Sequence, residues 1–185
     1  MPSLLNSGSP RRGRLVLAAT TLACLALQAC SKPSPTRLGA PIEGYNHTSA
    51  AINHFSVNGG GGSNFGPHLG GGSQTCCASM PAKWYPGLTA VVEWEKDPTP
   101  HAYGDWPEPP FTDAWRARMK KEKTNNTRHR AVVEVAPYEV LGVVDVHFLP
   151  CDQVAVSAVA ATPGHANYPF SYPSKMEEPA VCPAP

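Results

Sequence analysis

The chain has 185 residues, with 15 lysines and arginines against 14 aspartates and glutamates, a formal net charge of +1, 21 prolines and 16 glycines. A charge so close to zero argues against binding of nucleic acid through a basic surface, and the length suits one domain with a core of its own. The many prolines and glycines predict long loops and short strands.

The N-terminus carries the pattern of a secretory signal peptide. Three arginines precede the apolar stretch 15–27, which is too short to span a bilayer, since that takes about 20 residues. The stretch ends in L-Q-A-C, which resembles the bacterial lipobox, whose cysteine receives a diacylglyceryl group and becomes the new N-terminus. We therefore expect a lipoprotein signal peptide at 1–29 and a lipid anchor at Cys30. An ordinary signal peptide cut near Ala29 and an uncleaved anchor are the alternatives.

The residues after Cys30 favour the outer membrane. Ser31 stands where an aspartate would suggest retention in the inner membrane, so we expect the domain to face the periplasm. Residues 30–41 are expected to be the lipidated N-terminus and a solvated tether. A single β-rich domain is expected over 42–185.

Alternating apolar and polar residues indicate strands, and proline and glycine indicate what separates them. A glycine-dominated stretch at 58–73 and a proline-rich stretch at 97–110 are expected to be loops. One helix is expected from Thr112 to Lys123, because an acidic residue near its start and lysines at its end suit the helix dipole. The expected strands are 50–57, 88–96, 129–136, 143–148 and 154–159, the last two forming a hairpin.

These elements predict an all-β or β-dominated domain. The first choice is a small antiparallel sandwich with one short helix and long loops rich in proline and glycine, and the second is an open barrel. The last 24 residues hold six prolines and no clear element, so we expect Cys182 to hold this tail down.

Four cysteines remain besides Cys30 in the exported chain: Cys76, Cys77, Cys151 and Cys182. An even number in an oxidising compartment predicts disulfides. Because adjacent cysteines would close a strained ring, we expect Cys76 and Cys77 each to pair with one of the distant two. A metal site or a redox pair is the alternative, although the chain has no C-x-x-C.

Motifs of catalysis are lacking. The chain has no Gly-Lys pair of a phosphate loop, no G-x-G-x-x-G and no H-E-x-x-H. Ser63 and Ser73 follow glycines, but neither completes G-x-S-x-G. The seven histidines show no recognised ligand spacing, so we expect surface or hydrogen-bonded roles for them. We predict no enzyme activity, no metal, no cofactor and no small-molecule substrate.

Partner-binding residues are expected among the aromatic side chains. Trp84 with Tyr85, and Trp106 in the proline-rich loop, are candidates because Trp, Tyr and Arg dominate interface hot spots. They would form one contact surface together with the glycine-rich loop. A basic run from Arg116 to Arg130 could meet anionic lipid or an acidic partner, or be a solvated face.

Several short motifs resemble one family of proteobacterial lipoproteins. They are G-Y-N-H-T at 44–48, F-S-V-N-G at 55–59, the pair at 76–77 and V-D-V-H-F-L-P at 144–150. Over about residues 42–160 the chain is similar to the domain of unknown function 3304 family. The resemblance supplies no catalytic residues.

The resemblance also suggests a role. Some members of this family look like immunity proteins for lipase effectors of type VI secretion. The resemblance therefore implies a non-enzymatic lipoprotein, anchored in the outer membrane through Cys30, that binds and neutralises such a lipase. An envelope-assembly or structural lipoprotein that binds another envelope protein is the alternative.

Overall fold

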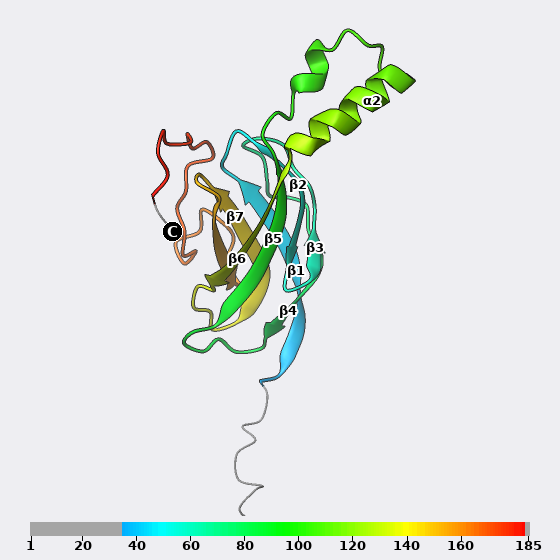
Figure 1. The fold of residues 1–185 in the computed structure, drawn as a ribbon. Helices are drawn as coiled ribbons and strands as arrows, with labels where there is room; N and C mark the ends of the chain where they lie inside the picture. The colour runs from blue at the N-terminus through cyan, green and yellow to red at the C-terminus, as the bar shows by residue number, and fades with distance from the viewer. Residues whose placement is uncertain (1–34, 184–185) are drawn as a thin grey trace, which may run out of the picture. The chain divides into compact units, whose positions relative to one another are not determined.

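The computed structural model describes residues 35–183, so the predicted signal peptide and Cys30 lie outside the described residues. Two four-stranded sheets pack face to face, with strand orders β4-β1-β7-β8 in the first sheet and β3-β2-β5-β6 in the second (Figure 1). The predicted β-sandwich is therefore confirmed. The strands are β1 (Arg37–Asn46), β2 (Ala51–Val57), β3 (Gly60–Gly62), β4 (Thr75–Pro81), β5 (Thr89–Asp97), β6 (Thr127–Glu134), β7 (Leu141–Leu149) and β8 (Gln153–Val159).

The two sheets differ in how their strands run. In the second sheet every neighbouring pair is antiparallel. In the first sheet β1 runs antiparallel to β4 but parallel to β7, and β7 and β8 form the predicted antiparallel hairpin. A parallel pair needs a long crossover connection, and here the chain from β1 to β7 passes through the whole second sheet. The expected antiparallel sandwich is thus corrected at this one pair.

The core lies between the sheets and is built from alternate positions of their strands. Phe148 on β7 lies at its centre, with its ring centroid 5.3 Å from Phe55 on β2 and 5.8 Å from Trp94 on β5. These aromatic contacts join the two sheets directly. The strands that supply them follow the alternation seen in the sequence, and Trp94 is a core residue as its pattern indicates.

Three strands lie where the sequence predicted none. β1 begins at Arg37, so the expected tether over 30–41 is wrong for its last five residues: the first four pair with β4, and Pro41 lies in a bulge of β1. β3 lies in the stretch expected to be a glycine loop, and β4 contains both adjacent cysteines. Composition indicates the local preference of a segment, whereas backbone pairing with a neighbouring strand decided the structure in each case.

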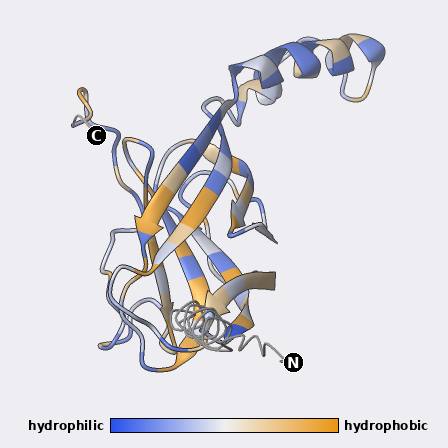
Figure 2. Cartoon of the chain, turned by 60° about the horizontal axis from the view of Figure 1, so that its bottom comes forward, coloured by the Kyte–Doolittle hydropathy of each residue, from blue (hydrophilic) through white to orange (hydrophobic). Residues whose placement is uncertain are grey.

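The predicted helix is present as α2 (Asp113–Glu122), with Thr112 as its N-cap. It belongs to a connection between β5 and β6, residues 98–126, that we call the arm. The arm also holds the 3-10 turns η1 (Ala102–Asp105) and η2 (Lys123–Asn125), and none of its residues is buried. It extends away from the sandwich (Figure 1) and is mostly hydrophilic in Figure 2, where the apolar colour follows the strands. None of the helices in residues 35–183 is both long and apolar enough to cross a membrane.

The tail after β8, residues 160–183, contains no strand or helix and crosses the outer face of the first sheet; we call it the strap. A disulfide between Cys151 and Cys182 ties its end to the β7–β8 turn. The expectation that Cys182 holds the tail is therefore confirmed.

The expected pairing of Cys76 and Cys77 with distant partners is wrong, because the structure pairs them with each other. The register explains why. Together they lie opposite a single residue of β1, Pro41, in a bulge between Ala40 and Ile42. Cys151 follows the end of β7, which is level with the end of β1 at Asn46. Asn46 is five residues beyond Pro41, which at about 3.3 Å per residue puts Cys151 about 16 Å from the cysteine pair along the strands. A disulfide across that distance would be impossible.

Candidate functional site

The outer face of the first sheet buries polar side chains. Glu43 and Tyr45 on β1, Asp145 and His147 on β7, and Ser157 on β8 alternate with core residues and therefore point away from the core. The strap covers them, so that Asp145 is only 2% exposed and His147 only 3%. A strand face that would ordinarily meet water is here closed off.

A chain of hydrogen bonds links this face to the strap. His47 Nδ1 lies 2.6 Å from the carbonyl oxygen of Pro173, His47 Nε2 lies 2.9 Å from His147 Nδ1, and His147 Nε2 lies 2.7 Å from the Tyr168 hydroxyl. A carbonyl can only accept, so His47 Nδ1 donates; because burial lowers the pKa of His47 and favours its neutral form, its Nε2 then accepts from His147. His147 Nε2 then accepts from Tyr168. Both imidazoles are thus neutral and each has a fixed tautomer.

The electrostatics of the cluster favour neutral groups. Burial, and to a lesser degree His47, lowers the pKa of His147 to about 3. Burial raises the pKa of Asp145 to about 7; the neighbouring Tyr168 hydroxyl opposes this shift and the charge of Glu43 adds to it. Burial likewise raises the pKa of Tyr168 above its usual range. Below pH 7 the cluster therefore keeps its proton on the carboxyl group and not on an imidazole.

Glu43 completes the acidic part of this face. It accepts hydrogen bonds from the backbone N–H of Gly72 and from the side chain of Gln74, at 3.2 Å for the latter. Burial, followed by the charges of Asp145 and Glu43, raises the pKa of Tyr45. Among residues 35–183 neither Glu43 nor Asp145 forms an ion pair. Two carboxyl groups are thus buried without a counter-charge.

Aromatic rings surround His147. The ring of Tyr45 stacks on it with centroids 4.9 Å apart and planes at 15°. Its other neighbours are the rings of His47, Tyr168, Phe170 and Tyr172, at centroid distances of 5.2 to 5.8 Å. Three of these five rings come from the strap, so the strap and the sheet build the cluster together.

A second aromatic cluster lies on the arm. The ring of Trp115 on α2 lies 6.0 Å from Trp106 and 5.4 Å from Phe111. The guanidinium of Arg118 sits 5.7 Å from the ring of Trp106 and bonds Glu108 at 2.7 and 3.0 Å. Phe111 is 72% exposed. Between the arm and the sandwich lies a cavity of about 880 Å³, whose lining includes Phe65, Pro67, Tyr103, Trp115 and Met119.

The predicted partner-binding residues do not form one surface. Trp84 donates from Nε1 to the carbonyl oxygen of Val135 at 2.9 Å and packs against the core. It lies with Tyr85 just after β4, level with the start of β1, whereas Trp106 lies on the arm at the opposite end of the strands. The glycine-rich loop lies beside β1 and β2. Of the three candidates, only Trp106 belongs to an exposed aromatic cluster.

The basic run is largely neutralised. Four of its arginines form ion pairs, with N–O distances of 2.7 to 3.5 Å: Arg116 with Asp113, Arg118 with Glu108, Arg128 with Glu95 and Arg130 with Glu93. Within the described chain, Lys120, Lys121 and Lys123 have no such partner. The unpaired charge of the run is therefore confined to the end of the helix.

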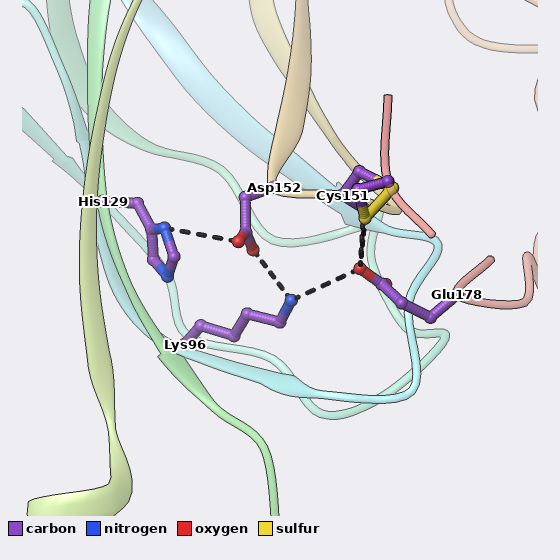
Figure 3. Close-up of a disulfide and its surroundings, with 6 residues drawn as sticks. Lys96, His129, Cys151, Asp152 and Glu178 are labelled. Atoms are coloured by element: carbon purple, nitrogen blue, oxygen red, sulfur yellow. Dashed lines mark hydrogen bonds and ion pairs between the residues drawn. A yellow bond between two sulfur atoms is a disulfide. The ribbon is translucent and has the colours of Figure 1, made fainter. Parts of the chain in front are cut away.

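The remaining candidates have structural roles. The hydroxyls of Ser63 and Ser73 bond each other at 3.0 Å. Lys96 of the second sheet bonds Asp152 at 2.8 Å. His129 lies 3.6 Å from Asp152, and Glu178 lies 4.0 Å from Lys96 (Figure 3). Cys151, Glu178 and Cys182 lie close enough to share a metal ion, but the two cysteines are joined as a disulfide. This cluster ties both sheets to the strap.

Sequence reasoning placed Asp145 and His147 on a polar strand face but left them at the surface. It gave Tyr168, Phe170 and Tyr172 no role, because an irregular tail has no periodicity from which to read its contacts. The usable signal was the aromatic spacing itself: three rings at alternate positions 168, 170 and 172 within a proline-rich tail. Aromatic rings at alternate positions of an irregular tail indicate that the tail packs against the surface of the folded domain.

The comparisons with known proteins point to a family. No curated protein and no solved structure matches this chain. A family model described as "Protein of unknown function (DUF3304)" matches residues 45–156, which is more than half of the chain and includes β1 to β8 in part or whole. The resemblance seen in the motifs is thereby confirmed, and the chain belongs to the DUF3304 family.

Proposed function

We propose that this protein is an envelope lipoprotein that binds a protein partner through its arm. The observation that carries the proposal is that the arm contributes no buried residue to the fold yet carries a partly exposed aromatic and arginine cluster. Aromatic and arginine side chains dominate the energetics of protein interfaces. A segment that the core does not need, and that carries these residues, is best explained by an external contact.

The position of the arm supports a partner away from the membrane. β1 begins at Arg37, at the end of the sandwich opposite the arm (Figure 1). The ten residues of β1 span about 33 Å at about 3.3 Å per residue. If Cys30 carries the lipid, the chain enters the domain at the end that is remote from the arm. The arm would then present its cluster to the periplasm.

The finer proposal names the partner. A lipase effector of type VI secretion suits the family resemblance, and the protein would neutralise it near the bilayer that the lipase attacks. Anchoring raises the local concentration of an inhibitor where its target acts. The alternative partner is another envelope protein, with a role in assembly. The lining of the arm cavity, which combines Phe65, Tyr103 and Met119, suits an apolar segment of either partner.

Site-specific crosslinking tests the arm. A photo-crosslinking amino acid placed at Phe111 in the full-length protein, in its native cells, should form adducts with one partner. The matched control is Tyr85, an aromatic residue 42% exposed at the other end of the sandwich, which should give none. Adducts at Tyr85 but not at Phe111 would refute the arm as the contact surface. Mass spectrometry of the adduct distinguishes a lipase from an envelope protein.

The anchor is tested separately. Replacement of Cys30 by Ala should move the protein from the outer-membrane fraction to the soluble periplasmic fraction, because lipid attachment requires the thiol. If the variant stays in the membrane fraction and the wild type carries no acyl chain by mass spectrometry, the lipoprotein proposal fails. The binding proposal would stand independently.

A further inference from the structure

A cavity of about 450 Å³ lies between the strap and the outer face of the first sheet. It is separate from the arm, which joins the other sheet. Its lining combines the aromatic rings of Tyr45, Tyr168, Phe170 and Tyr172 with three imidazoles, of His47, His147 and His165, and several small residues. The volume lies within the range of small-molecule sites.

The aromatic rings form part of a cage. Phe170 and Tyr172 stack with their centroids 5.5 Å apart and their planes at 26°. Tyr168 meets Phe170 edge-on, at 6.0 Å and 80°. On the sheet side Tyr45 lies flat against His147. Ring faces carry the negative part of the aromatic quadrupole and attract cations.

The cage contains no positive charge of its own. No lysine or arginine lines the cavity. Burial lowers the pKa of both His47 and His147, which favours the neutral imidazoles, and each then accepts one hydrogen bond in the chain that ends at Pro173. His165 Nδ1 accepts from the backbone N–H of Asn167 at 3.1 Å. An anion would find no charged partner here.

Two buried carboxyl groups lie on the same face of the first sheet as Tyr45 and His147. Glu43 lies beside Tyr45, and Asp145 beside Tyr168, close enough for each carboxyl group to raise the pKa of the neighbouring phenol. Both carboxyl groups are more than nine-tenths buried, and neither has an ion-pair partner in the part of the chain that the structure describes. A cation in the cavity would supply the counter-charge that these groups lack.

We infer that this cavity binds a small organic ammonium ion of the quaternary or methylated-amine class. Aromatic cages recognise such ions because the cation is large, weakly hydrated and has no need of directional ligands. A metal ion fits less well, since the ring nitrogens of His47 and His147 are occupied by hydrogen bonds with each other, with Pro173 and with Tyr168. The inference is independent of the proposed function of the arm.

Choline and its uncharged carbon isostere, 3,3-dimethylbutan-1-ol, test the inference by isothermal titration calorimetry on the purified wild-type domain. The two have nearly the same shape and differ in charge. Choline should bind about tenfold more tightly, which is the ratio expected for desolvated cation–π contacts. Equal affinity for the isostere would show an apolar pocket and overturn the inference, as would the absence of choline binding at millimolar concentration.

Substitutions place the site. Tyr172→Leu should weaken choline binding about tenfold, whereas Tyr172→Phe, which keeps the ring, should bind like the wild type. Tyr85→Leu, which alters an aromatic residue remote from the cavity, is the matched control and should change nothing. Unchanged affinity in Tyr172→Leu and in Phe170→Leu would mean that choline binds elsewhere, and would refute the site. If the leucine variants fail to fold, the comparison of choline with its isostere on the wild type decides alone.

Discussion

The strap and the arm are both irregular additions to the sandwich, and they differ in how the fold uses them. Tyr168 of the strap is buried, and the strap bonds His47 after β1 and His147 on β7 and ends in a disulfide. The arm is longer than most connections between strands yet buries none of its residues. The strap is therefore part of the folded structure, whereas the arm is an attachment to it.

This difference makes stability and binding separable. Changes in the strap should lower the free energy of unfolding, because they disturb buried contacts. Changes at exposed positions of the arm should leave that free energy nearly unchanged and affect only an external contact. Each prediction below tests one side of this comparison.

The largest effect is expected from the strap disulfide. Cys151→Ser with Cys182→Ser opens a loop with a sequence separation of 31, which should lower the free energy of unfolding by about 3–4 kcal/mol. Urea unfolding measures this loss. Cys76→Ser with Cys77→Ser is the control, because a disulfide between adjacent residues closes no long loop. An equal loss in both variants would contradict the role given to the strap.

A smaller loss is expected from the buried hydrogen-bond chain. Tyr168→Phe removes the hydroxyl that donates to His147 Nε2 and leaves that nitrogen buried without its partner, at a cost of about 1–3 kcal/mol. Tyr172→Phe removes a hydroxyl with no hydrogen bond in residues 35–183 and should cost under about 0.5 kcal/mol. Thermal unfolding compares the two. If the two losses are the same, the chain contributes no stability.

The free energy of unfolding of the wild type should depend only weakly on pH between about 4 and 6.5, because Asp145 and His147 act on it in opposite directions. The folded-state pKa of Asp145 is raised to about 7, so its contribution to stability falls as pH rises from about 4 to 7. The folded-state pKa of His147 is lowered to about 3, so its contribution rises with pH from about 3 to 6.5. Between pH 4 and 6.5 the two slopes oppose each other.

Asp145→Asn removes one of these opposing slopes. Its stability should rise more steeply than that of the wild type between pH 4.5 and 6.5, because only the histidine contributions remain. Urea unfolding at three pH values across that window measures both slopes. Parallel curves for wild type and variant would show that Asp145 does not hold a proton in the folded protein.

The smallest effect on stability is expected on the arm. Phe111→Ala removes a side chain that is 72% exposed, so the free energy of unfolding should change by less than about 0.5 kcal/mol. The same substitution should abolish or weaken capture of the partner identified by crosslinking. A loss of stability as large as that of Tyr168→Phe would place the arm within the fold.

Prediction from sequence succeeded where local pattern and final structure agree. The alternation Val144-Asp145-Val146-His147-Phe148 predicted β7 and its two faces, and Thr112 with Asp113 marked the start of α2. β1 and β3 were missed because their residues, including Pro41 and three successive glycines, have little strand propensity. Only their long-range partners make them strands.

The site was predictable in part. The sequence identified Asp145 and His147 as polar residues on a strand face and Trp106 as an exposed aromatic candidate. It could not show that the strap covers that face, since burial depends on contacts more than 20 residues apart, such as His147 with Tyr168. Nor could it show that Trp84 and Trp106 lie at opposite ends of the sandwich, which follows from the strand register.

The most direct test of the central claim is to replace residues 97–126, which are Asp97 and the arm, by an Asn-Gly turn that joins Lys96 to its register partner Thr127, and to measure the free energy of unfolding. Two antiparallel strands joined by this turn form a favoured hairpin, and a shorter connection costs less closure entropy. If the arm is only attached to the fold, the free energy of unfolding of the shortened variant should lie within about 1 kcal/mol of that of the wild type. A loss of several kcal/mol, or failure to fold, would contradict it and make the arm part of the fold.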